Sequence, residues 1–323
     1  MAHASAHVVG VDLGGTNMQI GVVDGDNRIV GQARLKTQST DGVDAVIDRL
    51  CEGIESACVG AGVKSRDLGG VGIGAPSPID AACRIILNAV NLRWRNVPLA
   101  DLVMSRLGGV ATTLDNDVNV AVWGECVLGA GRGYRNVLGV WVGTGVGGGL
   151  VLDGRLHHGT FGTAGEIGHL IMLPGGGPAS EKLEDHASRS AMERRATHLL
   201  RANEPSMMRE MVEGDFEQIR MRHVAEAIRQ GDAIAVRLGR HSARMVAIAA
   251  ANAATLLSLD CVILGGGGAE SLGDWYVQEV RRTFDDVVFP DTLRQCAIVP
   301  TQLRDNAGLL GAALLARQRL TEE

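Results

Sequence analysis

Apolar positions in the first part of the chain alternate with polar ones in short runs that end at glycine, asparagine or aspartate. Residues 7–12, 18–23 and 28–36 form three such runs, and the turn residues between them predict that each strand reverses into the next. From residue 43 to residue 57 the apolar positions recur at helical spacing, which predicts a helix. The chain is therefore predicted to open with an antiparallel meander followed by a helix.

Prolines mark the elements that follow this helix. Pro76 and Pro78 force a non-helical stretch after an apolar strand. Pro98 suits the first turn of a helix, because proline lacks the N–H that would be unpaired there. The predicted elements of this region are strands at 70–74 and 110–114, a helix at 98–107, and a helix that starts within 115–117 and ends near residue 128.

The second half of the chain repeats the opening theme. A strand at 137–142 reaches a glycine-rich turn at 143–147 and continues as a strand at 148–152. A duplicated strand–turn–strand unit places a ligand between two lobes, so we expect an α/β chain with two lobes. The remaining predicted elements are helices at 181–201, at 216–257, from residue 274 and at 306–319, with strands at 261–264 and 297–299.

Composition and charge exclude several classes of function. The 323 residues are enough for two domains with cores of their own. A net charge of −6 without a long basic run argues against a nucleic-acid partner. We expect neither a membrane span nor a signal peptide, because no apolar stretch reaches about 18 residues and the N-terminus lacks the leader pattern. Six scattered cysteines fit reduced thiols, which predicts a cytoplasmic protein.

Residues 13–17, called the first turn below, join two strands through the sequence Leu-Gly-Gly-Thr-Asn. The backbone N–H groups of such a turn form a concavity for anions, and the side chains of Thr16 and Asn17 add donors. Asp12, directly before the turn, would repel phosphates unless it faces Mg²⁺, directly or through water. A plain hairpin needs neither the acid nor the threonine, so the sequence favours a phosphate site. The candidate residues are Asp12, Gly14, Gly15, Thr16 and Asn17.

Residues 143–147, called the second turn, match the spacing G-x-G-x-x-G of dinucleotide-binding proteins. That motif needs a helix after the turn, whereas residues 149–152 continue as a strand, so we expect a second phosphate-binding turn. The chain contains no P-loop sequence, which removes that route to ATP. A glycine run at 265–268 follows a strand and can lie flat against an adenosine. The candidate residues are Gly143, Thr144 and Gly145 in the turn, and Gly265, Gly266 and Gly267 in the run.

The triplet Asp115-Asn116-Asp117 stands between a predicted strand and a predicted helix. A carboxylate at this position is presented to a cleft, where it can accept the proton of a hydroxyl that attacks a phosphoryl group. We therefore expect Asp117 to be a general base. Capping of the helix is the alternative role for the triplet, and Asp115 is the competing base if the register differs.

These segments, in this order, resemble those of the sugar kinase/actin/heat-shock ATPase superfamily, and over nearly the whole chain they resemble those of its ROK family. Residues 12–16 are similar to the family's first phosphate loop, 143–147 to its second, and 265–267 to its adenosine loop. Asn116-Asp117 resembles the pair whose aspartate is the catalytic base in the family.

Residues 165–169, Gly-Glu-Ile-Gly-His, are similar to the sugar-binding signature E-x-G-H of the family and are called the signature segment below. Glu166 and His169 are three residues apart, so both can reach one polyol with acceptor and donor bonds. Asn91 resembles a sugar-contacting asparagine ahead of a tryptophan, with Asn88 as the alternative. The resemblance implies sugar contacts from Asn91, Asn116, Asp117, Glu166, His169 and Glu184.

One segment departs from the family pattern. The family carries a cysteine cluster between this histidine and a Leu-Glu pair, which Leu183-Glu184 resembles, and the cluster binds a structural Zn²⁺ together with the histidine. In this chain residues 170–182 are short and contain no cysteine. Because thiolates are the ligands that such a site needs, we predict no zinc. Packing of Met172, Leu173 and Pro174 is expected to take over the structural role of the zinc site.

The resemblance implies a two-lobed ribonuclease-H-like (actin-like ATPase) α/β fold with the active site in the cleft between the lobes. We expect one lobe at 1–117, completed by the helix at 306–323, and the other at 118–305. The implied reaction transfers the γ-phosphate of ATP, with Mg²⁺, to a hexose hydroxyl, and glucose with its 6-OH is the expected acceptor. The resemblance also implies a homodimer.

Three alternatives stay open at this point. N-acetylmannosamine, N-acetylglucosamine, fructose and allose fall within the family's range, because a sequence does not reveal the stereochemistry read at one hydroxyl. The family also includes sugar-responsive repressors with an N-terminal helix-turn-helix, and only six residues precede the first predicted strand, so we expect no DNA-binding module. A non-catalytic actin-like scaffold is the third alternative, and the signature segment argues against it.

Overall fold

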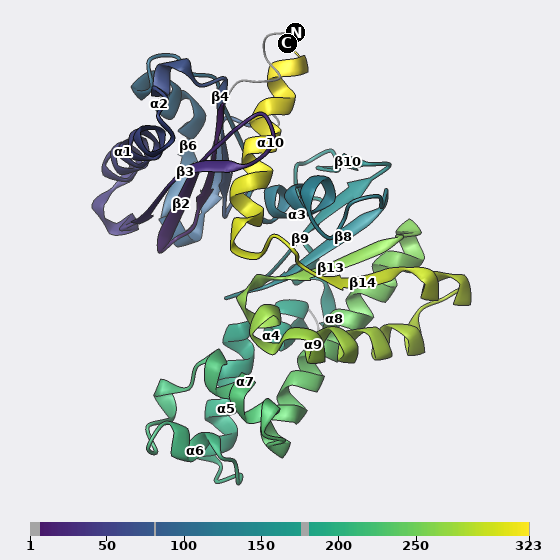
Figure 1. Cartoon of the computed structure of the whole chain (residues 1–323). Coiled ribbons are helices and arrows are strands. Elements are labelled where there is room, and N and C mark those ends of the chain that lie inside the picture. Colours follow the sequence, from purple (N-terminus) through teal and green to yellow (C-terminus); the bar gives the residue numbers. More distant parts are fainter. Residues whose placement is uncertain (1–6, 81, 176–180, 323) are drawn as a thin grey trace. The chain divides into compact units, whose positions relative to one another are not determined.

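The structure is a computed structural model that describes residues 7–80, 82–175 and 181–322 (Figure 1). It contains two compact units. Unit 1 holds the described residues within Met1–Arg132, Leu156–Ala164 and Asp305–Glu323, and unit 2 holds those within Gly133–Arg155 and Gly165–Arg304.

Unit 1 is built on a five-stranded sheet in the order β3-β2-β1-β4-β7. Its first three strands form the predicted antiparallel meander, and β4 and β7 extend the sheet in the parallel direction from β1. The carboxyl ends of β1, β4 and β7 therefore lie at one edge of the sheet, where the first turn and the aspartate triplet also are. The strands are β1 (Val8–Leu13), β2 (Asn17–Val23), β3 (Ile29–Lys36), β4 (Gly70–Ala75) and β7 (Thr112–Asn116).

Helices cover both faces of the sheet of unit 1. Because successive residues of β1 point to opposite faces, alternate positions contact different helices. Val9 and Val11 belong to one buried cluster with the apolar side chains of α1 (Val43–Ala61). Gly10, between them, meets the C-terminal helix α10 (Ala307–Glu322), and a Cβ at Gly10 would lie only 1.9 Å from the carbonyl oxygen of Leu309. Glycine on β1 thus lets the backbone of α10 rest directly on the sheet.

The same close approach recurs between α10 and α3 (Asp117–Leu128). A Cβ at Gly311 of α10 would lie 1.6 Å from the carbonyl oxygen of Val120 in α3. This packing groups α3 with unit 1, so the compact unit extends beyond residue 117. The other elements of unit 1 are α2 (Leu99–Arg106) and the hairpin of β5 (Ile86–Ala89) with β6 (Trp94–Val97), which the apolar pattern did not predict.

Unit 2 repeats the sheet of unit 1, in the order β10-β9-β8-β13-β14. Strands β8 and β9 are antiparallel on either side of the second turn, and β13 runs parallel to both β8 and β14. The predicted duplication of the strand–turn–strand unit is therefore confirmed. The strands are β8 (Val137–Val142), β9 (Val146–Leu152), β10 (Arg155–Leu156), β13 (Cys261–Gly265) and β14 (Ala297–Pro300), with a separate pair of β11 (Ile171–Leu173) and β12 (Glu181–Lys182).

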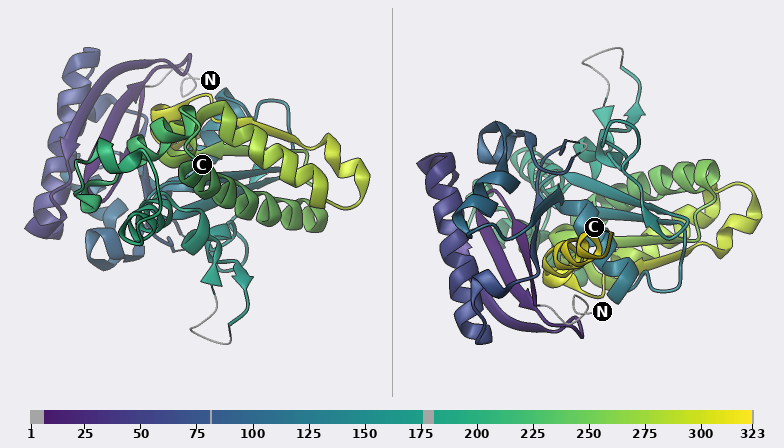
Figure 2. Two further views of the ribbon diagram at one scale, coloured as in Figure 1. Left: turned by 90° about the horizontal axis from the view of Figure 1, so that it is seen from below. Right: turned by 90° about the horizontal axis from the view of Figure 1, so that it is seen from above.

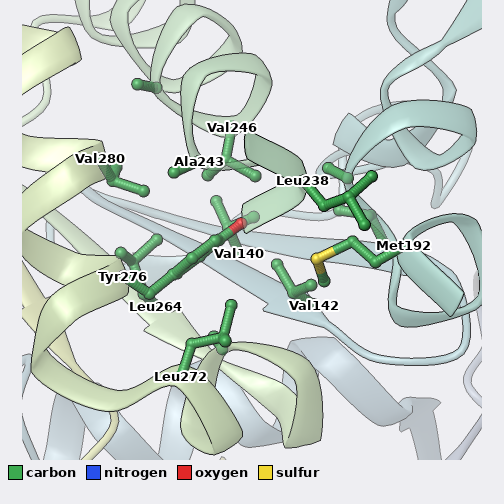
Figure 3. Packing of buried hydrophobic residues seen from close by; sticks show 14 of the residues in the cluster. Val140, Val142, Met192, Leu238, Ala243, Val246, Leu264, Leu272, Tyr276 and Val280 are labelled. Carbon is green, nitrogen blue, oxygen red and sulfur yellow. The ribbon is translucent and has the colours of Figure 1, made fainter. Parts of the chain in front are cut away.

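The core of unit 2 lies between its sheet and the long helices α8 (Ala233–Leu257) and α9 (Gly266–Val287), which run side by side (Figure 2). Figure 3 shows Val140 and Leu264 of the strands facing Tyr276 of α9 in this core. The buried Tyr276 hydroxyl is paired with Ser242 Oγ at 2.8 Å, which satisfies its polar end. The other helices are α4 (Leu183–Ala187), α5 (Arg189–Arg201), α6 (Met208–Met211) and α7 (Met221–Arg229).

Three predicted helices have other boundaries in the structure, and each difference occurs at a polar residue or a glycine. The helix expected at 181–201 is divided at Ser188, whose hydroxyl accepts from Ala191 N and caps α5. The helix expected at 216–257 is divided into α7 and α8, and Asp232 caps the second. Helix α9 begins at Gly266, eight residues before the expected start, with a non-helical Gly273 inside it. None of the helices in the described ranges is long and apolar enough to cross a membrane.

Candidate active site

The first turn is braced from inside unit 1. Gly14 N donates to Asn17 O at 2.9 Å, which closes the turn between β1 and β2. Thr37, buried at the end of β3, donates its hydroxyl to Gly14 O at 2.6 Å and its backbone N–H to Thr16 O at 2.9 Å. The side chain of Thr16 remains exposed, as a contact to phosphate would require.

Asn91 lies against this turn. A Cβ at Gly15 would be 3.0 Å from the Cβ of Asn91, so only glycine allows so close an approach. Asn91 belongs to the short helical turn Val90–Leu92 between β5 and β6, and its side chain is exposed. The alternative, Asn88, is also exposed, and its backbone N–H donates to Ser77 Oγ at 3.1 Å. The unpredicted hairpin is therefore what brings an asparagine to the first turn.

Asp12 occupies an acidic, largely buried position at the end of β1. Its carboxyl carbon would lie 3.0 Å from a Cβ at Gly308, near the start of α10. Burial, together with the negative charges of Asp117 and Asp305, raises the pKa of Asp12 to about 7, although Arg34 acts to lower it. The three aspartates are thus close enough to interact, and a cation placed among them would be stabilised.

The structure separates the roles of the three residues at the start of α3. Asn116 caps the helix, because its Oδ1 accepts from Val118 N at 2.9 Å and from Asn119 N at 3.2 Å. Asp117 is the first helical residue, and its Oδ1 accepts from Val118 N at 2.9 Å. A Cβ at Gly74 of β4 would lie 3.4 Å from its Cα, so the helix begins close to the sheet edge. Asn116 is therefore the capping residue, and the Asp117 carboxylate also accepts from the first turn of the helix.

Asp115 is buried within a network of hydrogen bonds. Its Oδ1 accepts from Asn116 N at 2.7 Å and from Asn119 Nδ2 at 2.9 Å. Its Oδ2 lies 2.6 Å from His158 Nε2, and this hydrogen bond raises the pKa of His158 although burial opposes it. Sequence analysis did not single out His158, because it is 43 positions away and no local pattern marks it. Asp115 is thus engaged in holding the end of β7.

Between the paired strand residues, the second turn is one residue shorter than the first, and it is closed by Gly143 N, which donates to Gly145 O at 2.9 Å. Strand β9 follows at Val146, so the dinucleotide-binding alternative is excluded by the missing helix. Glu184, at the start of α4, lies against this turn, because its Oε2 is 2.8 Å from the position of a Cβ on Gly145.

The signature segment is held on β9 by two glycines that cannot carry a side chain. A Cβ at Gly168 would lie 1.9 Å from Val146 O, and one at Gly165, with φ of +93°, would lie 2.8 Å from Gly148 O. Glu166 and His169 are exposed beside these contacts, and His169 Nδ1 lies 3.1 Å from Lys182 Nζ. The signature segment therefore lies directly beside the strand that leaves the second turn.

The glycine run is placed against the other side of the same turn. A Cβ at Gly266 or at Gly268 would lie 2.8 Å from Val142 O, the residue just before Gly143. A Cβ at Gly265 would meet the ring of Trp141 at 2.6 Å, whereas Gly267 faces open space. Unit 2 thus brings together the second turn, the signature segment, Glu184 and the glycine run, while unit 1 brings together the first turn, Asp12, Asn91, Asn116 and Asp117.

The predicted absence of zinc falls partly outside the described residues, because residues 176–180 of the shortened segment are among those not described. On either side of this gap, β11 and β12 pair through Ile171 with Lys182 and Leu173 with Glu181. The described residues include no group of three histidine, cysteine or acidic side chains arranged to hold a metal ion. The absence of zinc stays a prediction.

Comparison with known proteins shows which family has this sequence and fold. The model of the ROK family matches residues 8–319. Glucokinase from Streptomyces coelicolor is 34% identical over 319 residues, which cover 96% of this chain and 97% of that protein. The crystal structure of a ROK family glucokinase from Streptomyces griseus in complex with glucose and AMPPNP has a TM-score of 0.84 at 34% identity, over 97% of this chain and 99% of that one.

A second solved structure agrees with the first. The ROK hexokinase from Thermus thermophilus has a TM-score of 0.81 at 31% identity and covers 98% of this chain and 100% of that one. These likenesses show that the two sheets belong to the ribonuclease-H-like α/β fold of actin-like ATPases, which the sequence predicted. Because the family match extends over nearly all of its length, the chain belongs to the ROK family.

Proposed function

We propose that the protein is an ATP-dependent sugar kinase that phosphorylates the 6-OH of glucose. The observation that carries this proposal is whole-length identity of 34% with a glucokinase, joined to a solved glucokinase that holds glucose and AMPPNP. The residues that bear the motifs are present in this chain and lie in two local groups, one in each unit.

The sugar contacts are assigned to exposed or partly buried polar groups in both units. In unit 2, Glu166 and His169 supply an acceptor and a donor, and Glu184 supplies a second carboxylate next to Gly145. In unit 1, Asn91 beside the first turn and the amide of Asn116 supply further donors. A polyol needs several such directed bonds, because each hydroxyl both donates and accepts.

Contacts with ATP, the phosphate donor, are assigned to the glycine-rich segments. Backbone N–H groups of the two turns, with the hydroxyls of Thr16 and Thr144, bind the phosphates of ATP. The glycine run lies flat against the adenosine, and Gly267, which faces open space, permits that contact. No P-loop lysine is needed for this mode of binding.

The chemical step uses Asp117 as general base. Its carboxylate accepts the proton of the sugar hydroxyl as the hydroxyl oxygen attacks the γ-phosphorus. The new P–O bond forms while the bond between the γ-phosphorus and the β–γ bridging oxygen breaks, so ADP leaves with that electron pair. Donors at the two turns stabilise the charge that develops on the transferring group.

The acidic position of Asp12 fits a Mg²⁺ cofactor. Mg²⁺ prefers oxygen ligands and is usually held by one or two carboxylates together with substrate phosphates and water. The raised pKa of Asp12, next to Asp117, indicates a site where added positive charge is favourable. When bound, Mg²⁺ would neutralise phosphate charge, and Asp12 is the residue assigned to hold it.

A coupled assay of ADP release over about ten sugars tests the proposal. We expect turnover with glucose above N-acetylmannosamine, N-acetylglucosamine, fructose and allose. Preference for another sugar would reassign the acceptor, and binding of sugar and ATP without turnover would favour a sugar-sensing regulator. A homodimer and a cytoplasmic location complete the proposal, and light scattering that gives about the 33.9 kDa of one chain would contradict the dimer.

A further inference from the structure

Arg189 is tied to the second turn at two points, both within unit 2. It is the first residue of α5, and its backbone N–H donates to Gly143 O at 2.9 Å. Its guanidinium donates from Nη2 to Thr144 Oγ1 at 2.8 Å. The side chain therefore lies across the turn to which the proposed function assigns phosphate binding. Sequence analysis did not single it out, because an arginine near a helix start is usually a solvated residue.

The same side chain lines a hollow that reaches the glycine run. The hollow has a volume of about 510 Å³, and Arg189, Arg220, Arg222, Gly267 and Ser271 are among its lining residues. Gly267 is the member of the glycine run that faces open space. Arg189 thus stands between the segment assigned to adenosine and the segment assigned to phosphates, where the phosphate chain of a nucleotide would pass.

The guanidinium of Arg189 has hydrogen-bonding capacity to spare. Its Nε is buried and has no hydrogen-bond partner among the described residues. Within the described part of the chain, the ion pairs include none that involves Arg189, although arginines elsewhere in unit 2 pair with acids. A buried N–H without a partner is costly, and a guanidinium matches phosphate oxygens with two parallel bonds.

We propose that Arg189 is a further phosphate-binding residue of this protein and that it selects nucleotides by the length of their phosphate chain. It contacts the β- and γ-phosphates of the donor while it holds Thr144 in place. This inference rests on the proposed assignment of the second turn to phosphate binding. It goes beyond that assignment because it makes a side chain outside the turn responsible for much of the affinity for triphosphate.

The alternative is that Arg189 only stabilises the second turn. In that case its loss would disturb the turn and would weaken adenosine, AMP, ADP and ATP alike. A phosphate contact would instead spare adenosine and weaken ATP most, because the removed charge interacts only with the phosphate chain. Affinity along this series of ligands therefore separates the two roles.

The experiment is isothermal titration calorimetry of the full chain with adenosine, AMP, ADP and ATP, for wild type, Arg189→Ala and Arg189→Gln. The glutamine variant retains a donor for Thr144 Oγ1 but carries no charge. We expect both variants to lose about 10- to 100-fold in ATP affinity, the usual value of a hydrogen-bonded charge, with adenosine affinity changed less than about twofold. Arg194→Ala is the matched control, because Arg194 is exposed on the same helix and should leave the whole series unchanged.

Two results would overturn the inference. Equal losses for all four ligands would assign Arg189 a structural role, and full ATP affinity in Arg189→Gln would show that its charge is not used. If Arg189→Ala fails to fold, the glutamine variant alone decides the question. Because calorimetry requires no turnover, a wild-type protein that binds ATP but phosphorylates no sugar would count against the kinase proposal and leave the test of Arg189 intact.

Discussion

The first and second turns each join the first two strands of a five-stranded sheet, but their neighbours are very different. Each joins two antiparallel strands, and in each the leading glycine donates its N–H across the turn at 2.9 Å. The first turn follows Asp12, whose pKa rises to about 7 through burial and the charges of Asp117 and Asp305. The second turn is held by the guanidinium of Arg189 on Thr144, with Glu184 against Gly145.

This difference separates what a turn supplies by itself from what its neighbours add. The backbone gives each turn a concavity for an anion, whatever the surrounding sequence. Carboxylates beside the first turn suit it to hold a cation and to accept a proton, whereas a guanidinium beside the second suits it to hold phosphate. Duplication thus provided two turns of the same kind, and a few neighbouring side chains give each a different charge.

The largest effect is expected from removal of the base beside the first turn. Asp117→Asn keeps the shape of the side chain but cannot accept a proton, so kcat should fall by about 10²–10⁴-fold. Dissociation constants for sugar and ATP should change far less, because neither ground state requires proton transfer. Steady-state ADP release and calorimetry measure the two quantities.

Asp115→Asn is the matched control two residues away. This change weakens the hydrogen bond with His158, so its main cost should be about 1–3 kcal/mol in the free energy of unfolding, with kcat well above that of Asp117→Asn. Loss of turnover in Asp115→Asn but not in Asp117→Asn would move the base by two residues. Near-normal kcat in both would place the catalytic carboxylate elsewhere.

The second effect concerns stability and pH. The pKa of Asp12 is about 7 in the folded chain and near 3.8 when unfolded, so between these values the folded state binds the extra proton. The free energy of unfolding should therefore fall as pH rises from about 4 to 7, by at most about 4 kcal/mol from this group. Asp12→Asn should lack this slope and be the more stable protein at pH 8. Urea unfolding of both proteins in metal-free buffer at pH 5 and pH 8 measures this change in the free energy of unfolding. An equal change in wild type and in Asp12→Asn would contradict a raised pKa of Asp12.

A smaller effect is expected at the signature segment beside the second turn. His169→Ala should raise the KM for sugar about 10-fold, since it removes one hydrogen bond from an exposed side chain, and leave ATP affinity nearly unchanged. His198→Ala, an exposed histidine on α5, is the control and should alter neither. A change in ATP affinity with sugar binding intact would mean that the signature segment binds ATP and not the sugar.

No effect at all is expected from chelation of zinc. Purified protein should contain no stoichiometric zinc by elemental analysis, and EDTA should change neither refolding yield nor melting temperature. About one zinc per chain would show that ligands other than a cysteine cluster hold the metal, and it would add a cation close to the second turn.

Local chemistry explains which parts of the fold could be predicted from the sequence. The two strand–turn–strand units were predictable, because glycines between alternating apolar runs leave few other structures. The hairpin of β5 and β6 was missed because each strand has only four residues, of which the first and last are buried and the middle two exposed, so neither shows the alternation of a strand. The start of α9 was placed too late because a run of glycines has low helix propensity, which contacts with Val142 override.

The candidate residues divide in a similar way. Asp12 and the turn glycines could be found because each stands beside a recognisable turn. His158 and Arg189 could not, because each meets its partner only through the fold, across 43 and 45 positions. The division of roles among Asp115, Asn116 and Asp117 also required the structure, because a sequence cannot tell which of three polar residues caps a helix.

The position of α10 has a consequence for synthesis on the ribosome. Gly10 and Gly72 lack side chains so that the backbone of α10 can rest on β1 and β4, and these strands are translated some 235–300 residues before that helix. A nascent chain must therefore carry this sheet with one face uncovered, around Gly10 and Gly72, until α10 emerges. A premature stop codon before residue 307 would release a protein in which one face of β1 and β4 never acquires its helix.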